Sequence, residues 1–93
     1  MLDKKKFYIN GEWVNPYKEN NCDVIDPCTE DPFAVISLGS KEDTDLAVKA
    51  AKTAFETWKE TSKEERIDYL EKLLSIYKKR FSEMAEAISL EMG

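Results

Sequence analysis

The residues best suited to covalent chemistry in this 93-residue chain are its two cysteines, Cys22 and Cys28. They stand six positions apart, which fits neither a Cys-x-x-Cys redox pair nor the spacing of a zinc site. The chain has no histidine, so neither thiol has the commonest activating base. We therefore predict that both cysteines are small packing residues, and we assign no catalytic residue to the chain.

Binding chemistry is equally sparse. Glycine occurs only at positions 11, 39 and 93, so no glycine-rich phosphate loop can be built, and we expect this chain alone to bind no cofactor. The formal net charge of −5 disfavours nucleic acid, and we interpret the one basic run, Lys4–Lys6, as solvated. Since the chain has neither a membrane-length apolar run nor a secretory signal pattern, we expect no membrane partner and a cytoplasmic location.

The elements that would have to position any functional side chain begin with a hairpin at residues 7–15, FYINGEWVN. Its centre, Asn-Gly, is the preferred pair for a two-residue turn that needs positive φ at both positions. Residues 22–26 and 33–38 are typical of two further short strands, separated by a proline-bounded turn. So short a hairpin is unstable alone, and its aromatic side chains must therefore pack on something else.

Helical periodicity begins after residue 40. Ser40 followed by acidic residues indicates a helix start, and a helix is expected over about 41–60. Ser62 and Glu65 form a second capping-box pattern, which predicts another helix over about 63–92, with a possible break near 79–82. The predicted class is an α+β fragment, in which a hairpin and two short strands (about 7–38) precede two or three amphipathic helices.

Four segments now carry a resemblance: FYINGEWV, VIDP, VISLGSKEDTDLAVKAAKTAFETWKETSKEERIDYLEKL and AISLEMG. In their order and spacing they resemble the amino-terminal region of the aldehyde dehydrogenase superfamily. The resemblance implies that residues 1–93 are an amino-terminal segment of a Rossmann-like α/β cofactor-binding domain, with the catalytic domain absent. The chain departs from the family at Glu30, where the family turn usually has glycine, so the conformation of this turn is in question.

The resemblance also implies a reaction for the parent protein. Members of the family oxidise an aldehyde to a carboxylic acid with NAD or NADP, through a cysteine thioester that is hydrolysed with help from a glutamate base. In the family the catalytic residues and cofactor loops lie beyond the equivalent of Gly93. The implied role of residues 1–93 is scaffolding, with the remainder of the dehydrogenase chain as partner and a homo-oligomer as the expected assembly.

A possible monovalent cation site is the one set of ligands that the resemblance places in this chain. Some members hold such a cation between strand carbonyls and a carboxylate near the end of the second helical region, and the matching positions here are Val24, Ile25 and Glu91. Oxygen ligands suit a hard cation. The alternative, a strand that only packs and a solvated glutamate, stays open.

A rival hypothesis from another class is a free-standing helical-hairpin interaction or dimerisation protein. Its partner surface would be the apolar stripe of residues 67–92, and its helices would pack on each other. This explains the helices but gives the strands of residues 7–38 no role. On either hypothesis two packed helices leave apolar positions uncovered, so residues 1–93 are expected to self-associate, most simply as a symmetric dimer.

Overall fold

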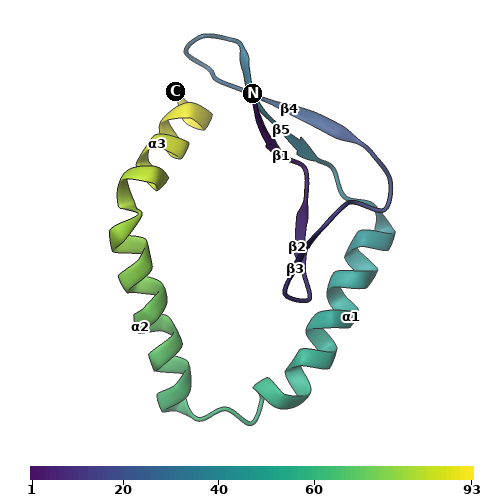
Figure 1. Ribbon diagram of the computed structural model, residues 1–93, viewed down its shortest axis with the longest axis vertical. Helices are drawn as coiled ribbons and strands as arrows, with labels where there is room; N and C mark the ends of the chain where they lie inside the picture. Colours follow the sequence, from purple (N-terminus) through teal and green to yellow (C-terminus); the bar gives the residue numbers. More distant parts are fainter.

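The computed structural model describes all 93 residues and has an α+β architecture, as predicted, with five strands followed by three helices. The three helices form an arc from the strands out to a far turn and back (Figure 1). None of the helices is both long and apolar enough to cross a membrane. The elements are β1 (Leu2–Lys4), β2 (Phe7–Ile9), β3 (Glu12–Val14), β4 (Asn21–Ile25), β5 (Pro32–Ser37), α1 (Lys41–Trp58), α2 (Lys63–Lys79) and α3 (Phe81–Met92).

The larger sheet has the strand order β1-β5-β4, with β1 parallel and β4 antiparallel to the central strand. β1 is not among the predicted strands. This strand has only three residues, two of them charged, so it has no local strand pattern. It forms because Leu2 pairs with Ala34, far along the chain. β4 and β5 lie one residue away from the predicted 22–26 and 33–38.

The predicted hairpin is confirmed as the two-stranded sheet of β2 and β3, with Ile9 paired to Glu12 across the turn. Asn10 and Gly11 both have positive φ, 54° and 78°, as the two-residue turn requires. The rings of Tyr8 and Trp13 lie 5.1 Å apart on an exposed face of the hairpin. The hairpin packs against α1, which supplies part of the support that so short an element needs.

Both predicted helix starts are correct, and the three-helix version of the prediction is confirmed. The helical run over 63–92 is interrupted at Arg80, whose φ of −106° and ψ of 17° are not helical. The connection between α1 and α2 is tied down, because Arg66 Nε donates to Thr61 Oγ1 at 3.0 Å. α1 ends at Trp58, two residues before the predicted end, and the Trp58 ring lies 5.5 Å from that of Tyr69.

The expectation that the two main helices pack together is wrong. From their connection α1 and α2 diverge to opposite sides of the molecule, and only the end of α3 returns to the strands (Figure 1). The radius of gyration is therefore 16.9 Å, against about 12 Å for a compact domain of this length. Apolar side chains that could have covered each other are therefore left exposed.

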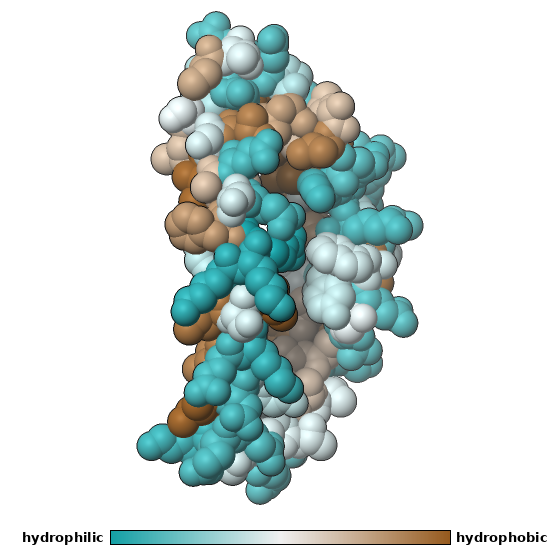
Figure 2. All heavy atoms as spheres, turned by 60° about the vertical axis from the view of Figure 1, so that its left-hand side comes forward, coloured by the Kyte–Doolittle hydropathy of each residue, from teal (hydrophilic) through white to brown (hydrophobic).

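The core is very small. Only Ala34, Ser37 and Asp43 are buried, and none of them belongs to α2 or α3. The accessible surface is 7968 Å², whereas a compact protein of this mass exposes about 5,500 Å². Figure 2 shows apolar side chains gathered along one edge of the molecule and towards its upper end, beside a hydrophilic face.

Candidate functional site

The most strongly held polar side chain in the molecule is the carboxylate of Asp43, which is only 6% exposed. It accepts hydrogen bonds from the backbone N–H of Tyr17 at 2.9 Å, from that of Ser40 at 2.9 Å and from the Ser40 hydroxyl at 3.0 Å. The Ser40 N–H, followed by the Tyr17 N–H, lowers the pKa of this carboxyl below its ordinary value. Asp43 therefore stays ionised and joins the loop after the hairpin to the start of α1.

The local part of this arrangement could be read from the sequence, and the rest could not. Asp43 is the third residue of α1, where a carboxylate is favoured by the free N–H groups and by the helix dipole. The contact with Tyr17 spans 26 residues and has no local signal. Beside it, Gly39 lies close to the Phe7 ring, since a Cβ at Gly39 would be 3.7 Å from Phe7 Cζ.

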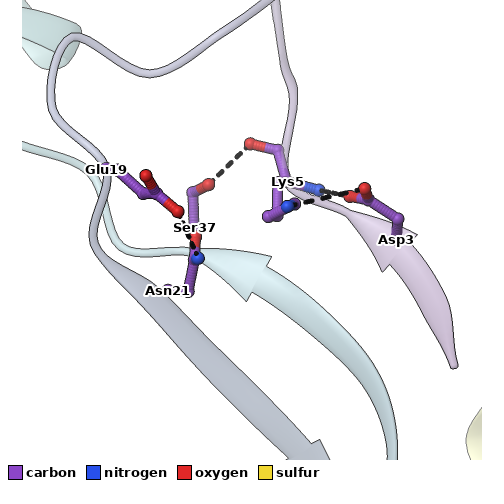
Figure 3. Close-up of polar contacts among 5 residues, drawn as sticks. All are labelled: Asp3, Lys5, Glu19, Asn21 and Ser37. Atoms are coloured by element: carbon purple, nitrogen blue, oxygen red, sulfur yellow. Dashed lines mark hydrogen bonds and ion pairs between the residues drawn. The ribbon is translucent and has the colours of Figure 1, made fainter.

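A second polar cluster lies where β1, β4 and β5 meet the segments before and after the hairpin (Figure 3). The Ser37 hydroxyl donates to the Lys5 carbonyl at 2.7 Å, and the Asn21 amide donates to Glu19 Oε1 at 3.0 Å. Lys5 in turn lies 3.6 Å from the Asp3 carboxylate. All of these residues except Asp3 line a polar hollow of about 280 Å³. The serine donates to a carbonyl rather than to a base, so the cluster joins strands and offers no activated nucleophile.

The structure leaves both cysteines as free thiols in different settings. Cys22 is half-buried in β4, and Cys28 is exposed in the turn between β4 and β5. The only hydrogen bond of the Cys22 thiol is a 3.6 Å contact to the Asp23 carbonyl, and the thiol of Cys28 makes none. No basic side chain hydrogen-bonds either thiol. The half-buried Cys22 fits the predicted packing residue, whereas for Cys28 that prediction is wrong, because the turn leaves its side chain exposed.

The three residues predicted to hold a cation lie on elements that meet at one end of the molecule. A Cβ at Gly93, directly after α3, would be 3.3 Å from Pro27 Cβ, so the end of α3 lies against the turn that follows β4. Glu91 is exposed in the last turn of α3 and forms no ion pair, while Val24 and Ile25 end β4.

The strand geometry there suits carbonyl ligands. The register of β4 against β5 shifts between Val24 and Ile25, and Ile25 is paired with Pro32, which has no N–H to donate to it. Backbone carbonyls and one carboxylate are oxygen ligands that a hard cation accepts. The structure contains no cluster of three or more His, Cys, Asp or Glu side chains suited to a metal ion, so any site here depends on main-chain oxygens.

Comparison with known proteins decides the family. The family model described as "Aldehyde dehydrogenase family" matches residues 13–93, which is most of the chain. The chain belongs to the aldehyde dehydrogenase family. This dehydrogenase segment is 44% identical over all 93 residues to a 3-succinoylsemialdehyde-pyridine dehydrogenase from a Pseudomonas species. It is 39% identical over the same length to a Staphylococcus aureus protein assigned as an aldehyde dehydrogenase.

A solved structure agrees with the sequence matches. The crystal structure of an aldehyde dehydrogenase from Bartonella henselae superposes on the whole segment with a TM-score of 0.99 and 58% sequence identity. In each of these comparisons the segment spans 20% of the relative's length. The family assignment made from the motifs is therefore confirmed, and the match continues through the strands, for which a helical-hairpin protein would have no use.

The glycines of this dehydrogenase segment do not form a dinucleotide site. Gly11 occupies a hairpin turn, Gly39 precedes α1 and Gly93 follows α3, so no two of them share a loop. A phosphate cradle needs consecutive open N–H groups at a glycine-rich helix start, and the start of α1 is instead occupied by the carboxylate of Asp43. These residues therefore do not fit NAD or NADP.

Proposed function

We propose that residues 1–93 act as the amino-terminal scaffold of an NAD- or NADP-dependent aldehyde dehydrogenase that oxidises an aldehyde to a carboxylic acid. The observation that carries the proposal is the superposition of the entire segment on a solved aldehyde dehydrogenase, with a TM-score of 0.99 at 58% identity. The cofactor requirement and the thioester chemistry come from the family resemblance, and residues outside this segment would perform them.

The open shape of the segment supports a scaffolding role. Its surface exceeds that of a compact protein of the same mass by about 2,500 Å², which is within the range that obligate interfaces bury. The exposed apolar side chains lie mostly on the helices, where they can pack on the cofactor-binding domain. We propose that α1, α2 and α3 form a layer on that domain, and that the parent assembles as a homo-oligomer.

The segment's own residues contribute position rather than chemistry. Asp43 fixes the direction of α1 relative to the hairpin, and the contact of Gly93 with Pro27 brings the end of α3 back to the strands. Together these contacts hold the two ends of the helical arc. Loss of either contact would displace the helical layer and, through it, the domain that binds substrate. Small displacements of catalytic groups there lower the reaction rate strongly.

The proposed activity can be tested with the intact protein and a panel of aldehydes, by following NADH or NADPH absorbance. Aldehyde-dependent reduction is expected, and it should survive Cys22→Ser and Cys28→Ser, because neither thiol has an activating base. Residues 1–93 expressed alone should give no signal. Loss of turnover in either serine variant with an unchanged melting temperature would place the nucleophile in this segment and overturn the proposal, as would an intact protein that reduces neither cofactor.

We further propose that the Val24 and Ile25 carbonyls and the Glu91 carboxylate hold a monovalent cation, on the strength of the shifted register and the adjacent end of α3. Thermal unfolding of the intact protein in potassium or sodium chloride, compared with choline chloride at equal ionic strength, is the test. A cation-specific rise in melting temperature should disappear in Glu91→Gln and persist in Glu86→Gln, a matched control on the same helix. Equal melting temperatures in all three salts would refute the site.

A further inference from the structure

The tip of the hairpin combines two groups that can react with each other. Asn10 and Gly11 are both exposed, and nothing lies within 4 Å of the position that a Cβ on Gly11 would occupy. The Gly11 N–H donates no hydrogen bond within the chain, and the side-chain amide of Asn10 makes none either. The nucleophile and the carbonyl are thus adjacent, unshielded by a side chain and free of competing partners.

We propose that Asn10 is a site of spontaneous deamidation, which converts it to aspartyl and isoaspartyl residues through a cyclic imide. Hydroxide removes the proton of the Gly11 N–H, and that nitrogen attacks Asn10 Cγ. A C–N bond forms, the bond from Cγ to Nδ2 breaks, and Nδ2 leaves as ammonia after taking a proton from water. Water then opens the imide at either carbonyl, and opening at the main-chain carbonyl leaves the chain linked through the side chain.

The other asparagines of the chain form an internal comparison. Asn15 precedes Pro16, whose nitrogen has no proton to lose. Asn21 lies in β4, and its amide nitrogen already donates to Glu19 at 3.0 Å. Asn20 and Asn21 are each followed by a residue with a side chain, which hinders approach of the nitrogen, and the Asn20 carbonyl is held by the Leu38 N–H at 2.7 Å. Only Asn10 is followed by glycine.

The product would change the hairpin itself. An isoaspartyl link adds a methylene to a turn that fits two residues, and either product places a carboxylate two positions from Glu12. The pairing that holds the Tyr8 and Trp13 rings 5.1 Å apart would loosen. Because Asn10 and Gly11 also line a hollow of about 480 Å³ against the alanine face of α1, the change would reach the packing of the hairpin on that helix.

The test is incubation of the intact protein at mildly alkaline pH and physiological temperature, followed by peptide mapping and isoaspartate detection. The probe of intrinsic reactivity is a linear peptide with the sequence of residues 7–15. We expect position 10 to gain the mass that replaces an amide NH₂ with OH, at a rate within about tenfold of the peptide, since an exposed turn opens at little cost. Positions 15, 20 and 21 should stay unchanged.

Asn10→Gly is the matched control, because glycine keeps positive φ at no cost and removes the amide. It should abolish isoaspartate while leaving the Trp13 fluorescence stable over the incubation, whereas the fluorescence of the parent protein should drift. A rate at position 10 more than about tenfold below that of the peptide would show that the folded turn protects the amide, and would overturn the proposal. Faster modification at another asparagine would overturn it equally.

Discussion

The strand region and the helical arm of this molecule are held together by different means. The strand region, taken as β1 to β5 with the start of α1, contains all three buried residues and the hydrogen bonds that span the largest distances in sequence. The helical arm, α2 and α3, contains no buried residue. Large apolar side chains such as Leu70 and Phe81 are at least 60% exposed there.

The difference follows from how each element satisfies its backbone. A strand forms hydrogen bonds only with another strand, so β1 cannot exist without β5, and the strand region must close on itself. A helix forms its hydrogen bonds internally and can project from the rest of the chain. Most helical stability in proteins nevertheless comes from packing an amphipathic face, so we expect the exposed arm to pack on a surface outside these 93 residues.

The largest expected effect tests whether the arm needs such a body. Residues 1–93 in isolation should self-associate at micromolar concentration, because the apolar face of α2 has no cover within the chain. Replacing Leu70 and Leu74 with lysine should weaken the association at least about tenfold, since burying one leucine contributes about 1.5–3 kcal/mol. Light scattering over a concentration series measures this.

Glu71→Lys is the matched control for that experiment, because it introduces the same charge next to Leu70 without removing apolar area. It should leave the association nearly unchanged. If the unmodified segment stays monomeric at every concentration and unfolds cooperatively, the helical arm is stable without a covering surface. The proposed difference between the two regions would then be wrong.

The second prediction concerns the contact that joins the regions at Asp43. Its pKa is lowered on folding, so its contribution to stability is fully present above the ordinary aspartate value of about 3.9. That contribution is lost as the pH falls through the lowered value. In the intact protein, Asp43→Asn should therefore reduce the melting temperature at neutral pH and flatten its decline on acidification.

Asp45→Asn provides the comparison, because Asp45 is an exposed aspartate on the same helix that pairs only with Lys41, at 2.6 Å. Such surface pairs contribute little, so its pH profile should follow that of the unmodified protein. Identical profiles for the two variants would mean that the Tyr17 and Ser40 contacts do not stabilise the folded state.

Sequence reasoning succeeded where the determinants are local. The hairpin rests on Asn10 and Gly11, and each of the two helix starts rests on a serine at the N-cap position. Each of these choices is made within a few residues, so composition and spacing reveal it. The break at Arg80 lies within the range of 79–82 in which a break was predicted.

It failed where the determinant lies far along the chain or outside it. β1 depends on β5, and the position of Asp43 depends on Tyr17, neither of which leaves a local pattern. The divergence of α1 from α2 is a failure of the second kind. An amphipathic stripe shows that a face must be covered but not by what, so the pattern could not distinguish a helix pair from two helices that pack on a third body.

The third prediction measures how far the arm depends on its own capping. The Ser62 hydroxyl accepts the Glu65 N–H at 3.2 Å, so Ser62→Ala should cost about 1 kcal/mol of unfolding free energy. Ser82→Ala, in the first turn of α3, removes a hydroxyl that makes no hydrogen bond and should have almost no effect. Chemical denaturation of the intact protein gives both values, and equal costs would show that the hydroxyl of Ser62 does not cap α2.

The smallest expected effect lies in the better-packed region, which also holds the strain. Glu30 has a φ of 64°, a conformation that suits the glycine usual in this family turn, and its N–H donates to the Asp26 carbonyl at 2.8 Å. The turn therefore keeps the glycine conformation although the residue has a Cβ. Holding a residue that has a Cβ in the left-handed conformation destabilises the folded state by about 1–2 kcal/mol. Glycine would remove this strain, but its greater freedom in the unfolded chain offsets part of the gain.

Glu30→Gly should therefore stabilise the intact protein by about 0.5–1 kcal/mol in chemical denaturation. Glu30→Ala separates backbone strain from the glutamate side chain, because alanine removes the carboxylate but keeps the Cβ, and it should leave the unfolding free energy nearly unchanged. If alanine stabilised as much as glycine, the cause would be the carboxylate beside the acidic neighbours Asp26 and Asp31. The backbone of the turn would then be unstrained, and the left-handed conformation of Glu30 would not lower the stability of the strand region.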